Sequence, residues 1–203
     1  LFISLGCDKN LVDSENMIGM MTAAGIEMTD EEAEADIIVV NSCCFIGDAK
    51  EESINTILEM AEYKKSGSCK ALIVTGCLAQ RYQDEIRTEI PEVDAIIGTN
   101  SYDTILKAVD QALEHQFFKS MQPLVGLPQI AARRALTTGG HFAYLKIAEG
   151  CNKNCTYCVI PSVRGRYRSV PMEELIAQAT SLVNDGVKEL VLVAQETTLY
   201  GVD

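Results

Sequence analysis

Three cysteines near the end of the chain, Cys151, Cys155 and Cys158, carry the most specific chemical signal in the sequence. They are spaced CxxxCxxC, and Tyr157 comes directly before the last of them. Cysteine thiolates hold iron–sulfur clusters, and a [4Fe–4S] cluster needs four ligands, so a compact triplet leaves one iron free. The pattern therefore predicts a cluster that binds a small molecule, rather than one that only stores electrons.

Zinc binding and disulfide bonding are the alternatives for these thiols. Structural zinc sites usually contain paired CxxC units or a mixture of Cys and His, but both histidines, His115 and His141, stand apart from the triplet. Disulfides are not expected either, because the sequence has no secretory signal and is long enough to form a core. No apolar run approaches the ~20 residues that span a bilayer. We therefore expect reduced thiols in a soluble, cytoplasmic protein without a membrane partner.

The residues around the triplet predict a βαβ unit. Residues 142–148 form an apolar run typical of a buried strand, and residues 171–184 have helical periodicity. Residues 189–194 form a second apolar run of the kind that parallel sheets bury on both faces. Gln195 and Glu196 follow this second strand. Parallel α/β folds place ligand sites at the carboxyl ends of their strands, so both residues are candidates for binding a cofactor.

The first half of the sequence predicts a parallel sheet built from βα units. Strand-like runs, each followed by helical periodicity, occur at 1–5, 36–40, 71–75 and 93–97. The first three runs begin 35 residues apart, which is about the size of one such unit. Asp13 or Ser14 is expected to cap the first helix, because both residue types favour that position.

Cys7, Cys43 and Cys77 each follow one of the first three predicted strands, at spacings of 36 and 34 residues. Parallel strands bring their carboxyl ends to one edge of a sheet, so these thiols predict a second iron–sulfur site there. Small buried cysteines with no ligand role are the alternative. Cys69 precedes its strand and should take no part, whereas Cys44 is adjacent to Cys43 and spacing alone does not choose between them.

The triplet and Tyr157 resemble the motif of the radical S-adenosylmethionine enzymes. That resemblance implies that the free iron of the cluster on these cysteines binds the amine and carboxylate of S-adenosylmethionine. It also implies that Tyr157 contacts the adenine. Reduction of the bound molecule then releases a 5′-deoxyadenosyl radical. An electron donor such as a flavodoxin or a ferredoxin is expected as a partner.

Three further segments resemble the amino-terminal domain of one subfamily, the methylthiotransferases, and the likeness extends from residue 1 to residue 203. The segments are SLGCDKNLVDSE at 4–15, NSC at 41–43 and TGC at 75–77. This resemblance implies two [4Fe–4S] clusters, the second of them on Cys7, Cys43 and Cys77. It selects Cys43 over Cys44, because the family's ligand is the second residue after an asparagine.

Within the family, residues 159–169 and 194–201 look most like the branch that methylthiolates an aspartate β-carbon of ribosomal small-subunit protein twelve. The branch that modifies adenosine in tRNA typically carries Gln-Met-Asn where this chain has residues 8–10, Asp-Lys-Asn. From a different class, the alternative is an electron carrier with two clusters. Ferredoxins, however, supply four cysteines per cluster rather than three.

Charge bears on the choice of partner. The net charge is −12, with a dense acidic run at 30–36, so the chain lacks the broad basic surface of a general nucleic-acid binder. Such a chain suits a basic partner such as a ribosomal protein, although acidic surfaces also serve solubility. Arg164, Arg166 and Arg168 form the main basic cluster. They could bind a carboxylate of the target aspartate or of the methionine moiety, or they could form a solvated face.

The expected fold class is α/β in two parts. Residues 1–115 form the amino-terminal parallel-sheet βα domain of the methylthiotransferase type, with the auxiliary cluster. Residues 116–141, rich in Pro and Gly, form a linker with a short helix around 131–135. Residues 142–203 begin a radical S-adenosylmethionine partial (β/α) barrel. Two strands do not close a barrel, so the catalytic domain is expected to be truncated, and the resemblance implies a further TRAM domain.

Overall fold

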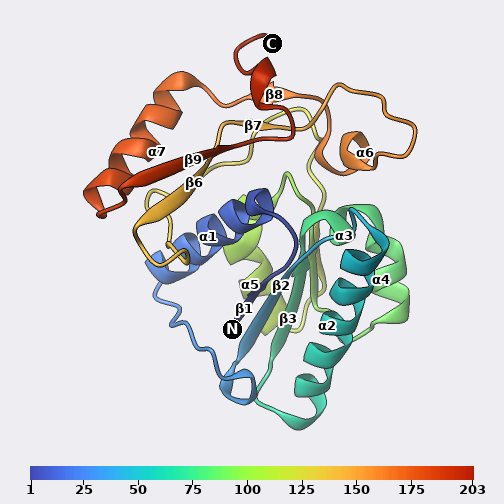
Figure 1. Ribbon diagram of the computed structural model, residues 1–203. Coiled ribbons are helices and arrows are strands. Elements are labelled where there is room, and N and C mark those ends of the chain that lie inside the picture. The colour runs from blue at the N-terminus through green and yellow to red at the C-terminus, as the bar shows by residue number, and fades with distance from the viewer.

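A five-stranded parallel sheet forms the centre of the first part of the protein (Figure 1). The computed structural model describes residues 1–203. The strands lie in chain order: β1 (Phe2–Ser4), β2 (Ile37–Ser42), β3 (Ala71–Thr75), β4 (Ala95–Ile97) and β5 (Phe118–Ser120). Val39 of β2 is in register with Phe2 on one side and with Ile73 on the other. The four strands predicted from the sequence are therefore present and parallel.

Both faces of this sheet are covered by helices, because successive side chains of each strand point to opposite faces and both sets are apolar. Ile38 and Leu72 belong to the core on one face, whereas Val39 and Ile73 belong to the core on the other. The first core is covered by α2 (Gly47–Ser66), α3 (Gly76–Arg81) and α4 (Gln83–Glu89), and the second by α1 (Asp8–Ala23) and α5 (Ile105–Leu113) (Figure 1). Three short 3-10 helices lie at Glu32–Glu34, Tyr102–Thr104 and Thr197–Leu199.

The predicted linker at 116–141 contains the fifth strand of the sheet. In β5, Phe118 is in register with Ala95 of β4, so the sheet extends beyond the expected boundary at residue 115. Sequence patterning missed β5 because it has only three residues, with Lys119 exposed between two half-buried ones. Short edge strands carrying a lysine lack the apolar run by which central strands are found.

The expected helix around 131–135 does not form. The backbone N–H of Ala131 instead donates to Asn16 Oδ1 of α1 at 3.0 Å. The approach to α1 is close, since a Cβ at Gly19 would lie 2.3 Å from the carbonyl oxygen of Arg133. Because α1 supplies partners for the backbone of the linker, this segment runs along the helix instead of coiling on itself.

The second part of the protein contains the predicted βαβ unit. Its strands β6 (Phe142–Lys146) and β9 (Glu189–Val193) are parallel, and α7 (Met172–Asn184) connects them. Two further short strands, β7 (Ala148–Glu149) and β8 (Arg168–Ser169), pair antiparallel, and α6 (Ile160–Arg164) lies between them in sequence. In Figure 1 this part lies beyond the carboxyl ends of the first sheet, with β6 against α1 and α6 against α3.

No helix of the protein combines the length and the apolar character that crossing a membrane would require.

Candidate functional site

Three thiols of the first part lie at the carboxyl edge of the sheet, as predicted. Cys7 follows β1 and stands at the N-cap of α1, Cys43 follows the last residue of β2, and Cys77 is the second residue of α3, just after β3. Cys7 is exposed, whereas Cys43 and Cys77 are buried. The side chain of Cys43 packs against Gly6, next to Cys7. The three thiols are close enough that Cys43 and Cys7 both raise the pKa of Cys77, adding to the larger effect of burial.

Gly76, the residue before Cys77, permits a close approach between β2 and the start of α3. Its φ is +92°, and a Cβ there would lie 2.3 Å from Asn41 Oδ1. Gly25 has a similar φ of +85°, but a Cβ there would meet nothing within 4 Å. Gly25 is therefore the matched control for the cost of the backbone conformation alone.

We expect Gly76→Ala to destabilise the protein more than Gly25→Ala. The left-handed conformation costs an alanine about 1–2 kcal/mol at either position. At residue 76 the crowding adds about 1–3 kcal/mol. Urea denaturation of the two variants measures the difference in the free energy of unfolding. Equal losses would contradict the close approach at Gly76.

The adjacent cysteines have different surroundings. Cys44 belongs to the apolar core, its Sγ donates to the carbonyl oxygen of Cys77 at 3.3 Å, and burial raises its pKa to about 11. Cys43 lies outside that core, and its backbone N–H donates to Ser53 Oγ at 2.9 Å. The Cys44 thiol is engaged with a backbone carbonyl inside the apolar core, so the geometry favours Cys43. Cys69 lies at the opposite, amino end of β3, as predicted.

The second set of thiols lies in one loop between β7 and α6, and the pairing of β7 with β8 closes this loop at its base. The backbone N–H of Cys151 donates to the carbonyl oxygen of Gly165 at 3.1 Å, and that of Cys158 donates to Cys155 at 3.0 Å. Cys155 is exposed and the other two cysteines are half-buried. Tyr157 is 89% exposed, so its ring is free to meet a ligand beside the loop.

The end of β9 faces this loop. Lys153, from the loop, forms an ion pair with Glu196, and its backbone N–H donates to Cys151 Sγ at 3.4 Å. The ammonium group of Lys153 holds the pKa of Glu196 below its ordinary value. Gln195 Oε1 is buried and has no hydrogen-bond partner. Because buried polar atoms are nearly always paired, this oxygen is suited to accept a hydrogen bond from a bound cofactor.

The donor chemistry of both sets fits iron–sulfur clusters, since all eight cysteines are free thiols and each set offers three of them. No three His, Cys, Asp or Glu side chains are arranged so that they could hold a single metal ion. The structure brings each set of thiols to one edge or one loop.

Four charged residues form a buried network between the two parts of the protein, and of these only Arg164 was a candidate site residue from the sequence. Arg164 Nη1 contacts Asp13 Oδ2 at 2.7 Å and Glu149 Oε1 at 3.0 Å. Lys146 Nζ contacts Glu149 Oε1 at 2.5 Å and also pairs with Asp13. We call Asp13, Lys146, Glu149 and Arg164 the interdomain ion network. The predicted capping role of Asp13 or Ser14 was wrong, because α1 begins at Asp8 and both residues lie within it.

The members of the interdomain ion network hold each other in their charged forms. Burial alone would favour neutral groups. Despite burial, Asp13 and Glu149 raise the pKa of Lys146, while Arg164 and Lys146 lower the pKa of Glu149 to about 2. Two cations therefore balance two anions. The sequence feature that could have indicated this network is a lysine and a glutamate in an otherwise mostly apolar strand region, residues 142–149.

The three arginines after the cysteine loop have separate surroundings. Arg164 is buried in the ion network and Arg166 is exposed. Arg168 Nη1 donates to the carbonyl oxygens of Leu124 at 3.0 Å and Arg166 at 2.6 Å. Arg164 is thus the member of this cluster that faces the interior, so the three arginines do not form a uniformly solvated face.

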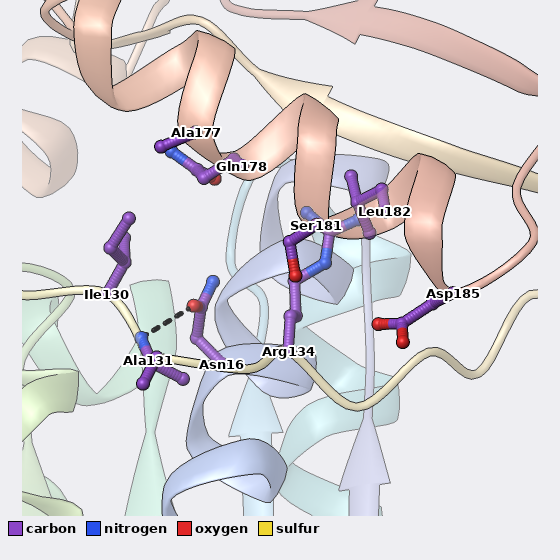
Figure 2. A pocket seen from close by; sticks show the side chains of 10 residues that line it. Asn16, Ile130, Ala131, Arg134, Ala177, Gln178, Ser181, Leu182 and Asp185 are labelled. Atoms are coloured by element: carbon purple, nitrogen blue, oxygen red, sulfur yellow. Dashed lines mark hydrogen bonds between the residues drawn. The ribbon is translucent and has the colours of Figure 1, made fainter.

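A cavity of about 220 Å³ lies between α1, the linker and α7. Figure 2 shows Arg134 extending between Asn16 and Ser181 at its wall. Arg134 Nε is 3.1 Å from Glu15 Oε2, and its Nη2 donates to the carbonyl oxygen of Tyr144 at 2.7 Å. None of the predicted site residues lines this cavity, which is therefore separate from both cysteine sets.

Comparisons with known proteins agree with this division into two parts. Residues 1–98 match the model of the Uncharacterized protein family UPF0004, and residues 145–202 match the Radical SAM superfamily. The second match implies S-adenosylmethionine and a [4Fe–4S] cluster as cofactors.

Curated relatives match the whole chain. The chain is 64% identical over 202 residues to the "Ribosomal protein uS12 methylthiotransferase RimO" of Lachnoclostridium phytofermentans, covering 100% of this chain and 46% of the relative. Proteins of the same name from Clostridioides difficile (51% identity, 98% of this chain, 45% of the relative) and Solibacter usitatus (50%, 100% and 43%) are also similar. The chain spans about half the length of the curated relatives it matches. From the two family matches and this identity along its whole length, the chain belongs to the methylthiotransferase family of radical S-adenosylmethionine enzymes.

Proposed function

We propose that the protein carrying this chain is a transferase that adds a methylthio group to the β-carbon of an aspartate of ribosomal protein uS12. The observation that carries this proposal is the 64% identity, along the whole chain, to a relative named as a uS12 methylthiotransferase. The chain spans about half of that relative. The activity is therefore proposed for the whole protein, with this chain supplying the cofactor-binding residues.

Cys151, Cys155 and Cys158 are the proposed ligands of the radical cluster. Tyr157 would face the adenine of S-adenosylmethionine, and Gln195 and Glu196 would bind its polar groups, because both follow β9 and Gln195 has the unpaired oxygen described above. When bound, the cluster and S-adenosylmethionine supply the electron and the radical that remove hydrogen from the substrate carbon. The residues of the chain position these groups and exclude water.

Cys7, Cys43 and Cys77 are the proposed ligands of a second, auxiliary [4Fe–4S] cluster. Three strands deliver these free thiols to one edge of the sheet, which supports a shared role. A cluster held by three cysteines keeps one iron free for a sulfur to be transferred. An external reductant of the flavodoxin or ferredoxin class would supply electrons to the enzyme.

The net charge of −12 supports a basic protein partner, and a ribosomal protein is such a partner. We propose a cytoplasmic location as well, because the proposed substrate is a ribosomal protein. Modification of adenosine in tRNA is less well supported, because the matched relatives carry the name of the uS12 enzyme. A pure electron carrier is disfavoured by sets of three thiols, since ferredoxins use four per cluster.

Mass spectrometry of uS12 tests the proposed substrate. Deleting the gene of the whole protein should remove an increment of about 46 Da, the difference between H and SCH₃, from uS12. The methylthio-adenosine content of tRNA in the same cells should not change, which is the control. Loss of the tRNA modification with unchanged uS12 would overturn the proposed substrate and favour the tRNA branch.

A further inference from the structure

Arg164 belongs to the radical S-adenosylmethionine part of the chain but reaches the cysteines of the other part. It ends α6, which packs against α3, and Thr99 Oγ1 holds α6 by donating to the carbonyl oxygen of Val163 at 2.5 Å. Arg164 Nη2 donates to Asn10 Oδ1. The thiol of Cys77 is directed at the same oxygen, with Sγ 3.9 Å away. One amide oxygen therefore lies between the guanidinium and a proposed cluster ligand.

Asn10 is itself held firmly in place. Its Nδ2 donates to the carbonyl oxygens of Leu5 at 3.0 Å and Ser42 at 3.1 Å, the residues that lead into Cys7 and Cys43. The same asparagine thus contacts the backbone near two of the proposed ligands and the thiol of the third. The oxygen of the Asn10 side-chain amide contacts Arg164 and Cys77, and its nitrogen holds the backbone near the other two ligands. A shift of Arg164 would therefore be transmitted to all three cysteines of the auxiliary site.

The charges around Arg164 are fully buried. Asp13, Lys146 and Glu149 face it from α1, β6 and β7, and Arg164 is 2% exposed. Buried ion pairs contribute little net stability compared with apolar residues of the same volume, because desolvation offsets the attraction. Buried charges nevertheless act strongly on the reduction potential of a nearby redox centre, since solvent screens them poorly.

We propose that Arg164 is a positioning residue for the auxiliary cysteine set, where it fixes Asn10 and Cys77 and raises the reduction potential of the cluster bound there. The proposal rests on the proposed function, because it requires that Cys7, Cys43 and Cys77 hold a cluster. Net charge and hydrogen bonds near the sulfurs set the potential of such clusters. A permanent cation stabilises the reduced, more negative state.

The surroundings of Cys77 agree with this role, because the guanidinium of Arg164 and the thiol of Cys77 both approach Oδ1 of Asn10. Since the guanidinium comes from the radical S-adenosylmethionine part, the potential of the auxiliary cluster depends on how the two parts dock. Asp13 carries the opposite charge at the same place, so its removal should have the opposite effect.

The test is an EPR-monitored redox titration of the whole protein after anaerobic reconstitution, with the iron content measured first. Arg164→Gln should shift the midpoint potential of the auxiliary cluster to more negative values, and Asp13→Asn should shift it to more positive values. Arg164→Lys, which keeps the charge, should lie closer to the wild type than Arg164→Gln. Arg166→Gln is the matched control, since Arg166 is exposed on the same segment, and it should leave the potential unchanged.

Opposite shifts for Arg164→Gln and Asp13→Asn would support the proposal, because a merely structural defect has no reason to change sign with the charge. Shifts of the same sign, or no shift in either variant, would overturn it. If Arg164→Gln fails to bind iron, Asp13→Asn decides alone: a more positive potential supports the proposal, and an unchanged or more negative one overturns it. A wild-type protein with only the radical cluster would overturn the two-cluster proposal and this one together. Two clusters without opposite shifts would overturn this one alone.

Discussion

Replacing Cys151, Cys155 and Cys158 together with alanine should abolish the cleavage of S-adenosylmethionine and remove about half of the iron from the reconstituted whole protein. The cleavage should disappear because these thiols are the proposed ligands of the iron that binds the cofactor. Iron should fall by only half, because the auxiliary set lies on a separate sheet and stays intact. Formation of 5′-deoxyadenosine and colorimetric iron analysis measure the two effects.

Cys69→Ala is the control for this experiment. Cys69 is a buried thiol at the amino end of β3, away from both cysteine sets, so the variant should keep its iron and its cleavage activity. Full iron content in the triple variant would refute the assignment of the radical cluster. Loss of iron in Cys69→Ala would show that buried thiols are needed for reasons other than ligation.

Variants of the adjacent residues Cys43 and Cys44 should separate the cleavage of S-adenosylmethionine from methylthiolation. Cys43→Ala should lose the auxiliary cluster and methylthiolation, yet keep the reductive cleavage of S-adenosylmethionine, because the radical cluster lies in the other part. Cys44→Ala should keep both clusters, since its thiol donates to a backbone carbonyl and lies in the apolar core. Iron content, 5′-deoxyadenosine and modified uS12 are measured for each variant.

The result that would contradict this assignment is loss of the auxiliary cluster in Cys44→Ala with its retention in Cys43→Ala. Cys44→Ser serves as a second comparison, because it keeps a donor for the carbonyl of Cys77 but removes the sulfur. If Cys44→Ser keeps the cluster and Cys44→Ala has a lower melting temperature, the role of Cys44 is packing.

The sheet and the edge at which the thiols lie could be predicted from the sequence for a physical reason. β2 and β3 are buried on both faces, so their residues form continuous apolar runs that are easy to find. Once the strands are parallel, residues that follow them must meet at one edge. That geometry placed Cys43 and Cys77 together, and separated Cys69 from them, before any side-chain contact was known.

The features that escaped prediction depend on contacts between distant segments. β5 is too short and too polar for a strand pattern, and it pairs only because β4 offers an edge. The linker at 131–135 lies along α1 because Asn16 supplies a partner for its backbone. Asp13 was interpreted as a helix cap because its partners, Arg164 and Lys146, are more than 130 residues away in sequence.

The most direct test of the two-cluster account is a titration of the reduced whole protein with S-adenosylmethionine, followed by EPR after the iron has been counted. Two cubes require about eight irons, and S-adenosylmethionine should alter the spectrum of the radical cluster. The same alteration should persist when Cys7, Cys43 and Cys77 are all replaced with alanine and the iron falls to about four. A wild-type protein with about four irons, or a spectrum that S-adenosylmethionine does not change, would contradict the account.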